Sequence, residues 1–417
     1  MKVLHIATYD NFGGAARAAY RQHLALRQSG VNTSMLVRHK VTSDPAVKLF
    51  LGATDMFTRV NRTLWRSKIA RLEKKSRAKG IGGLTDPRAD LLRAASPEIA
   101  GADVINLHKT ERFADLPRLL ADLPEEKPVV ITLHDISPVT GGCDYPGDCQ
   151  RFTQSCGQCP LLTNRGENDY SRNIFEWRRA AYATRDQRRF AFVANSHWTG
   201  KLAEASGLVA GRRVEVIHYG LDHTVYSPER RAEARAAFGI GPDEKVVAFA
   251  AHDLRLKHKG GDLLLTALRQ LPESGQVRLL TMGSGHLDVG SRFRHSHFGR
   301  VESDELQALI YRAADVFVIP SLEEAFGQTA LESAACGALV AGFAVGGVVD
   351  IVQNGVNGEL VERGNAGALS QAIARLLQNR GLQNQWQGQA ANWAQTHFSY
   401  AKNAACYQAL YESLVRG

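Results

Sequence analysis

The 417-residue sequence has no apolar stretch that is long and uninterrupted enough to span a bilayer. The best candidate, Ala338–Val352, is rich in glycine and contains Asp350, so it is expected to form a strand and a loop. The N-terminal MKVLHIATYD has one basic residue and reaches Asp10 before any cleavage-like site. It therefore predicts a buried first strand in place of a signal peptide, and a cytoplasmic protein.

The sequence also lacks low-complexity tracts and short repeats, and its length predicts about two domains. Apolar, β-rich runs alternate with helical patterns from end to end, which indicates an α/β fold with parallel sheets built from βαβ units. The pattern restarts after a looser stretch near residue 222. We therefore expect one domain over 1–221, a second over 222–400, and a C-terminal helix over 401–417, for which a return to the first domain is one option.

The net charge of +9 is concentrated in one segment. Residues 57–80 hold nine Lys and Arg residues against the single acid Glu73, and apolar residues recur there at helical spacing. This pattern predicts a basic amphipathic helix, which suits an anionic membrane surface or an acidic, phosphate-bearing acceptor. Alternatively, the helix packs on the first domain through its apolar stripe. Nucleic-acid binding ranks lower, because no recognised nucleic-acid module accompanies the charge.

Residues that follow the strands are the candidates for a site, because ligands of open α/β sheets bind beyond the carboxyl ends of the strands. Gly13 and Gly14 follow the first strand and lead into a helix. Such a pair lets the backbone approach a ligand, and the helix N-terminus favours an anion, although a plain tight turn is the commoner explanation. The absence of a full GxGxxG pattern argues against a dehydrogenase.

His108 and His134 end two further strands of the first half. An imidazole in this position can hydrogen-bond a sugar hydroxyl or a developing charge. A histidine whose hydrogen bonds are satisfied within the fold is the commoner explanation for each.

A basic turn, Arg255–Lys259, opens the second half after its first strand. Fixed positive charge suits a diphosphate leaving group, since no metal-ligating acid pair stands nearby to recruit Mg²⁺. A solvated basic loop is the alternative.

The strongest pattern is Pro320–Glu332, PSLEEAFGQTALE, in which a strand ends, a turn holds Glu324, and a helix is expected to begin near Gly327. The helix N-terminus can face nucleotide phosphates. Because Glu332 lies more than one turn into the helix, the two carboxylates would reach different hydroxyls of one extended ligand and would not form an acid/base pair. The alternative is one solvated acid and one helix-stabilising acid.

These residues resemble the retaining GT-B glycosyltransferases of family 4 over nearly the whole chain. The resemblance rests on Gly13-Gly14, Lys259-Gly260, Glu324-x7-Glu332, Gly346–Val352 and Asn357-Gly358. A closer likeness to bacterial exopolysaccharide transferases of the colanic-acid type rests on Thr132–Asp135 with the cysteine loop that follows, and on Ala251–Arg255 with Lys259.

The resemblance implies two Rossmann-like domains that face each other across a cleft, and a metal-independent, hexosyltransferase-type transfer from a nucleotide-sugar with retention. The departing phosphate would act as the base, so no cofactor is required for catalysis. The acceptor implied is a lipid-linked oligosaccharide of surface polysaccharide assembly, at the inner face of the cytoplasmic membrane. The implied contacts are Gly13 and Gly14 with the donor, Arg255 and Lys259 with the diphosphate, Glu332 with the ribose, Glu324, Phe326 and Gly327 with the donor sugar, and His134 near the reacting sugar. One departure is Ala325, where the family often has Gly; it is tolerable if its φ stays negative.

Four of the six cysteines lie in one Gly-rich loop over 141–160: Cys143, Cys149, Cys156 and Cys159. A cytoplasmic location disfavours disulfides. Cys156-x-x-Cys159 has metal-ligand spacing, whereas the gap from Cys143 to Cys149 is longer than in ordinary zinc knuckles, so a structural Zn²⁺ is a candidate. Cys336 and Cys406 are expected in the core.

Two other functions stay open. One is a sugar-nucleotide epimerase or phosphorylase on the same fold, which would need acid/base carboxylates at the anomeric position or a pyridoxal lysine; neither motif is found. The other is a non-catalytic nucleotide-sugar-binding protein at the membrane, which would bind the donor without turnover.

Overall fold

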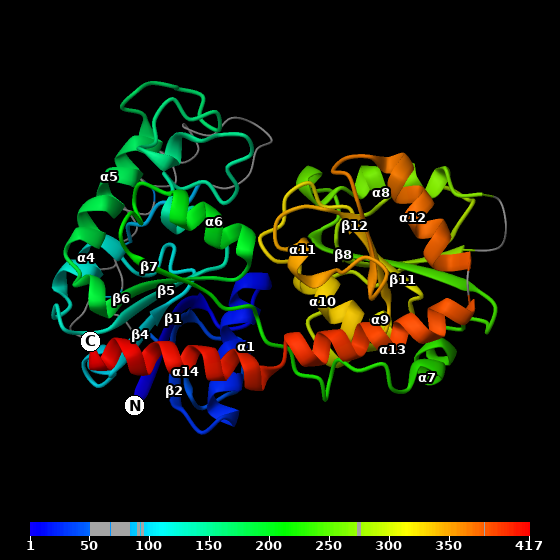
Figure 1. Cartoon of the computed structure of the whole chain (residues 1–417), viewed down its shortest axis with the longest axis horizontal. Helices are drawn as coiled ribbons and strands as arrows, with labels where there is room; N and C mark the ends of the chain where they lie inside the picture. Colours follow the sequence, from blue (N-terminus) through cyan, green and yellow to red (C-terminus); the bar gives the residue numbers. More distant parts are fainter. Residues whose placement is uncertain (51–66, 68–83, 90–91, 93–95, 273–276, 379) are drawn as a thin grey trace. The chain divides into compact units, whose positions relative to one another are not determined.

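The computed structural model describes residues 1–50, 67, 84–89, 92, 96–272, 277–378 and 380–417, without the side chains of 380–384. The predicted basic helix over 57–80 lies outside these residues, apart from Ser67. The chain divides into two compact units (Figure 1): unit 1 is Met1–Gly220 with Tyr400–Gly417, and unit 2 is Leu221–Ser399. Among the described helices, none is long and apolar enough to cross a bilayer.

Unit 1 contains a parallel sheet whose described strands lie in the order β3-β2-β1-β4-β5-β6-β7. The strands are β1 (Lys2–Tyr9), β2 (Asn32–His39), β3 (Val47–Leu49), β4 (Val104–Leu107), β5 (Val129–Leu133), β6 (Phe190–Ala194) and β7 (Arg213–Val216). β4, β5 and β6 are buried along their whole length, as expected of apolar strands covered on both faces. Alternate residues enter two cores, so that Ile105 and Val129 face one side and Val104 and Val130 the other.

Helices cover both faces of this sheet (Figure 1). They are α1 (Gly14–Gln28), α3 (Pro97–Ala100), α4 (Leu116–Asp122), α5 (Tyr170–Ala183), α6 (His197–Ala205) and α14 (Tyr400–Arg416), with short 3₁₀ turns η1 (Ser137–Val139), η2 (Arg151–Thr153) and η3 (Gln187–Arg189). α14 runs beside α1. It buries two tyrosines: the hydroxyl of Tyr411 accepts a hydrogen bond from Gln22 Nε2 of α1 at 3.0 Å, and the hydroxyl of Tyr407 lies 3.2 Å from Thr132 Oγ1 of β5. These contacts bind the last helix of the chain to unit 1.

Unit 2 contains a second parallel sheet, in the order β10-β9-β8-β11-β12-β13. Its strands are β8 (Lys245–Asp253), β9 (Val277–Ser284), β10 (Arg294–His297), β11 (Val316–Ile319), β12 (Leu339–Phe343) and β13 (Gly358–Val361). Its helices are α7 (Arg231–Ala237), α8 (Gly261–Arg269), α9 (Asp304–Ala313), α10 (Gln328–Ala335), α11 (Val348–Ile351), α12 (Ala366–Gln378) and α13 (Arg380–His397), with the turn η4 (Lys257–Lys259).

Both sheets have the 3-2-1-4-5-6 strand order of doubly wound Rossmann folds, with one further strand in unit 1. The predicted α/β class with two Rossmann-like domains is confirmed. In each sheet, successive strands are added first towards one edge and then, from β4 or β11 on, towards the other edge. The places where this direction changes lie between β1 and β4 and between β8 and β11, and we call them the reversal points. Ligands are expected at the carboxyl ends of these strands.

Candidate functional site

The basic turn and the glutamate motif of unit 2 meet at the carboxyl end of β11. Lys259 Nζ donates a hydrogen bond to Glu324 Oε2 at 2.6 Å, and Ser321 Oγ donates to the same oxygen at 3.3 Å. The Lys259 and Glu324 side chains are 20% and 14% exposed, so the pair is reachable but largely shielded from water. Two motifs that are separate in the sequence therefore form one charged site.

Close backbone packing fixes the position of Glu324. Gly260 has φ +73°, and a Cβ there would lie 1.8 Å from the carbonyl oxygen of Pro320. Gly346 has φ +50°, and its Cβ would lie 1.8 Å from the carbonyl oxygen of Glu324, which also accepts from Gly347 N at 3.0 Å. Only glycine fits these two positions, because a side chain would collide with backbone atoms. The turns on either side therefore clamp the segment that carries Glu324.

α10 begins directly after this segment. Its N-cap is Gly327, with φ +102° and no side chain to cap the helix. Phe326 is buried, and its ring packs edge-on against Phe398 with centroids 6.0 Å apart. Ala325 does not have a positive φ, so the departure from glycine at this position causes no backbone strain. The N-terminal end of α10 favours negative charge next to Glu324.

Glu332 lies within α10 and is only 3% exposed. It accepts a hydrogen bond from the hydroxyl of Tyr311 at 3.2 Å. An ionised carboxylate has about four lone-pair positions, so a second partner can share it. Tyr311 was not singled out from the sequence, since it lies in a different helix, α9.

Arg255 is paired with Asp253, which the sequence did not indicate. Arg255 Nε and Nη2 donate to the two oxygens of Asp253 at 3.0 and 2.8 Å. The side-chain hydrogen bonds from Arg255 lower the pKa of Asp253 to about 2. The arginine is 68% exposed, so it can reach a ligand if it shares or exchanges this partner.

A row of buried hydrogen-bonding rings crosses the sheet of unit 1. His134 Nδ1 lies 2.6 Å from the hydroxyl of Tyr219, and His134 Nε2 lies 2.9 Å from His108 Nδ1. His108 Nε2 lies 2.9 Å from His5 Nδ1. Burial lowers the pKa of His134 to about 3 and that of His5 and His108 well below the usual value, so the rings are neutral at pH 7. Both nitrogens of His134 are engaged, and a ring contact with a sugar hydroxyl requires one of these bonds to be exchanged.

A cavity at the carboxyl ends of β4 and β5 is lined by His108, His134 and several charged residues. Lys109 Nζ lies there 2.6 Å from Asp135 Oδ2, 3.4 Å from Glu111 Oε1 and 3.5 Å from Asp144 Oδ1. Burial, followed by the like charge of Asp135, raises the pKa of Asp144 to about 7. One ammonium among three carboxyl groups leaves spare hydrogen-bond acceptors in this cavity.

Gly13 and Gly14 lie at the start of α1. Gly13 is the N-cap, with φ +82°, and no side chain caps the helix. A Cβ at Gly13 would meet nothing within 4 Å, so the glycine is required by its backbone conformation and not by lack of space. The preceding Asp10 accepts from the backbone N–H groups of Val41 and Thr42 at 2.8 Å each, which fixes the entry to this turn.

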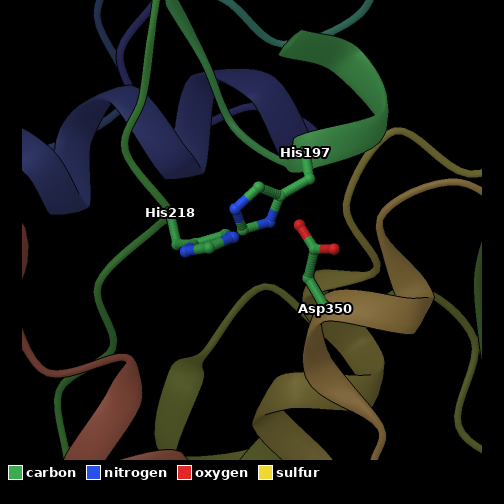
Figure 2. Close-up of side chains that lie close together, drawn as sticks. All are labelled: His197, His218 and Asp350. Carbon is green, nitrogen blue, oxygen red and sulfur yellow. The ribbon is translucent and has the colours of Figure 1, made fainter. Parts of the chain in front are cut away.

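Two further histidines of unit 1 appear in Figure 2, and neither was singled out from the sequence. His197 begins α6 and His218 follows β7, with ring centroids 5.2 Å apart. The third side chain in that view, Asp350, belongs to α11 of unit 2.

The four thiols of the cysteine loop line one cavity of unit 1. Gly141 N donates to Cys156 Sγ at 3.0 Å. Burial raises the pKa of Cys156 to about 12 and raises that of Cys143 as well. Among the described residues, no three of these sulfur atoms come within 4.8 Å of one another, so a shared ion would require the side chains to turn inward.

Comparison with known proteins bears mainly on unit 2. Residues 230–393 match the family model described as "Glycosyl transferases group 1". The D-inositol 3-phosphate glycosyltransferase of Mycobacterium sp. strain KMS is 36% identical over 181 residues, which are 40% of this chain and 39% of that protein. The enzyme of the same name from Mycobacteroides abscessus is 37% identical over 183 residues, 40% of each chain. The chain thus aligns with about two fifths of the length of these relatives.

Solved structures resemble the whole chain at low sequence identity. Sucrose-phosphate synthase from Thermosynechococcus elongatus has a TM-score of 0.65 at 18% identity, over 100% of this chain and 99% of its own. Anabaena Alr3699/HepE, solved with UDP and glucose, has a TM-score of 0.63 at 18% identity, over 99% and 100%. WaaG, a glycosyltransferase involved in lipopolysaccharide biosynthesis, has a TM-score of 0.64 at 15% identity, over 100% of both chains. These similarities show the GT-B fold.

Proposed function

We propose that this protein is a glycosyltransferase that moves a sugar from a nucleotide-sugar donor to a saccharide acceptor. The observation that carries the proposal is the Lys259–Glu324 pair at the carboxyl end of β11, 2.6 Å apart. It lies at the reversal point of a Rossmann-like sheet, in the part of the chain that is similar to group 1 glycosyltransferases.

The charged pair suits a ligand with a diphosphate next to a sugar. An ammonium group has three donors, so Lys259 can bind a phosphate oxygen while it keeps Glu324. Glu324 retains lone pairs for two sugar hydroxyls, and the clamped backbone holds it in place. We assign Arg255 and the N-terminus of α10 to the diphosphate, Phe326 and Gly327 to the sugar through their backbone, and Glu332 to the ribose. Gly13 and Gly14 complete the proposed donor contacts.

Bond cleavage at the anomeric carbon places negative charge on the departing diphosphate. Fixed positive charge from Lys259 and Arg255 stabilises that charge without a metal ion. We assign the proton of the acceptor hydroxyl to the departing phosphate, with retention at the anomeric carbon, and we place His134 near the reacting sugar. In this scheme Glu324 binds and orients the sugar, and no cofactor is required.

The donor and the acceptor are the finer parts of the proposal. Because the Anabaena neighbour was solved with UDP and glucose, a UDP-sugar is the first donor to test. The curated relatives are named for D-inositol 3-phosphate, whereas we propose a lipid-linked saccharide of surface or exopolysaccharide synthesis, as in the colanic-acid type. We place the enzyme in the cytoplasm, with residues 57–80 in contact with the inner face of the membrane.

A screen of UDP-, GDP- and ADP-sugars tests the function. One arm measures hydrolysis of the donor. Three further arms measure transfer to lipid extracts, to inositol 3-phosphate, and to anionic vesicles that carry extracted glycolipid. We expect one donor class to be turned over. Glu324→Ala should lower the rate by about 10²-fold or more, because it removes a contact at the reacting sugar. Glu323→Ala, which changes the neighbouring acid, is the matched control and should retain the rate.

Equal rates for wild type and Glu324→Ala would contradict the site. An epimerised nucleotide-sugar without acceptor would favour the epimerase alternative. Donor affinity without turnover in every arm would favour a binding protein.

A further inference from the structure

Three histidines cluster at the carboxyl ends of β9 and β10, outside the site described above. His295 and His297 lie two residues apart on β10, so they share one face of this edge strand, and His286 follows β9. The ring centroids are 5.7 Å apart for His286 and His295, 5.9 Å for His286 and His297, and 6.1 Å for His295 and His297. Each imidazole is therefore a near neighbour of the other two.

One buried hydroxyl holds two of these rings. Thr281 is fully buried on β9, opposite His297 in the register of the sheet. Its Oγ1 lies 2.8 Å from His295 Nε2 and 2.9 Å from His297 Nδ1. One hydroxyl oxygen thus holds the rings of His295 and His297 next to each other.

The spacing of the rings is close to that of a three-histidine metal site. Imidazole nitrogen binds Zn²⁺ at about 2.0–2.1 Å in tetrahedral geometry, which puts the centroids of three such rings about 5.2 Å apart. The observed 5.7–6.1 Å exceed this value by less than about 1 Å. Among the described residues the ring nitrogens of these three histidines do not all lie within 4.8 Å of one another, so a shared ion requires the rings to turn inward, as for the cysteine loop. A set of imidazoles without carboxylates suits Zn²⁺, Ni²⁺ or Cu²⁺, and not Mg²⁺ or Ca²⁺.

We propose that His286, His295 and His297 form a binding site for a divalent transition-metal ion, with Zn²⁺ as the first candidate. Binding exchanges the hydrogen bonds to Thr281 for bonds to the ion and leaves a fourth position for water. The site requires only the fold of unit 2 and does not depend on the proposed transferase activity.

The cluster also lies next to the proposed diphosphate site. Gly285 precedes His286, and a Cβ at Gly285 would lie 2.7 Å from Arg255 Nε and 2.8 Å from Asp253 Oδ1. The backbone of this turn therefore packs directly on the Arg255–Asp253 pair. An ion bound to His286 restrains the turn beside Arg255.

Calorimetric titration with ZnCl₂ alone tests the site, using the untagged full chain after treatment with a chelator. We compare wild type with the triple variant His286→Ala, His295→Ala, His297→Ala, and with Cys156→Ser, Cys159→Ser as the matched control for the cysteine loop. Wild type and the cysteine variant should share one binding event that the triple variant lacks. The single variant His286→Ala changes an exposed side chain and should weaken this event about tenfold or more even if the triple variant does not fold.

Zinc affinity and stoichiometry that are the same in wild type and in His286→Ala would overturn the proposal. The proposal would also be overturned if the cysteine variant bound no zinc, because all zinc bound by wild type would then belong to the cysteine loop.

Discussion

At the scale of single residues, position along the chain predicts candidates, but partners become visible only in the fold. Lys259 and Glu324 each follow a strand, and they meet although 65 positions separate them. His134 also follows a strand, yet the residues that engage its nitrogens, His108 and Tyr219, lie 26 and 85 positions away. Strand order and register decide such contacts, and neither could be predicted from this sequence alone. The roles assigned to these residues stay predictions.

Asp144 gives a residue-scale prediction about stability. Its pKa is about 7 in the fold against an ordinary 3.8, so between these pH values the unfolded chain has lost a proton that the folded chain keeps. This difference lowers the free energy of unfolding as the pH rises from about 4 to 7. Asp144→Asn has no proton to lose at this position. The difference in melting temperature, Asp144→Asn minus wild type, should therefore be higher at pH 8 than at pH 5 by at least about 2 °C. Differential scanning calorimetry at both pH values measures this, with the exposed Asp148→Asn as control. A difference between Asp144→Asn and wild type that is the same at pH 5 and pH 8 would contradict it.

At the scale of elements, the residue at which a helix begins indicates whether its N-terminus is available to a ligand. α4, α5, α6 and α9 are capped by side chains of Asp115, Asp169, Ser196 and Ser303. α1, α8 and α10, which follow β1, β8 and β11 at the reversal points, begin at Gly13, Gly260 and Gly327 without a side-chain cap, whereas the helix that follows β4 is the capped α4. A capping side chain would compete with an anionic ligand for the first N–H groups of the helix. We therefore predict that the three uncapped helix starts bind the anionic parts of the ligand.

Elements also set the limits of prediction from the sequence. Cys406 was expected in the core because its surroundings are apolar and helical, but it is exposed, and this prediction was wrong. α14 buries its Tyr407 and Tyr411 face against unit 1, and Cys406 points away from that face. Cys336 is buried as expected. Helical periodicity identifies an apolar stripe, but the packing partner decides which edge of the stripe is covered.

The cysteine loop carries the element-scale prediction about metal. Four thiols line one cavity, and the backbone N–H of Gly141 donates a hydrogen bond to Cys156 Sγ. This arrangement fits a structural zinc site once the four side chains turn inward. We expect stoichiometric zinc in the protein as purified, and one equivalent of zinc less together with a lowered melting temperature in Cys156→Ser, Cys159→Ser. Elemental analysis and thermal unfolding measure both. A preparation without zinc, whose melting temperature a chelator leaves unchanged, would rule the site out.

At the scale of the whole molecule, the alternation of strands and helices, together with the length of the chain, predicted two α/β domains with parallel sheets, and the family resemblance implied that they are Rossmann-like. Parallel strands that are buried on both faces consist of apolar runs. The segments between these runs show the helical spacing of the helices that connect the strands. Strand order was not predictable, because it depends on contacts between distant segments. The chain leaves unit 1 after Gly220 and returns to it at Tyr400. The similarity to group 1 glycosyltransferases covers 230–393, within unit 2, so the donor half of the proposal is better supported than the acceptor half.

The central claim is that Glu324 and Glu332 hold different parts of one nucleotide-sugar. Calorimetric affinities for the active nucleotide-sugar and for its parent nucleoside diphosphate test this claim most directly, in wild type, Glu324→Gln and Glu332→Gln. Loss of a charged hydrogen bond should weaken binding about tenfold or more. The account predicts that Glu332→Gln weakens both ligands alike, whereas Glu324→Gln weakens the nucleotide-sugar and leaves the nucleoside diphosphate nearly unchanged. Equal losses for both ligands in Glu324→Gln, or unchanged nucleoside diphosphate affinity in Glu332→Gln, would contradict it.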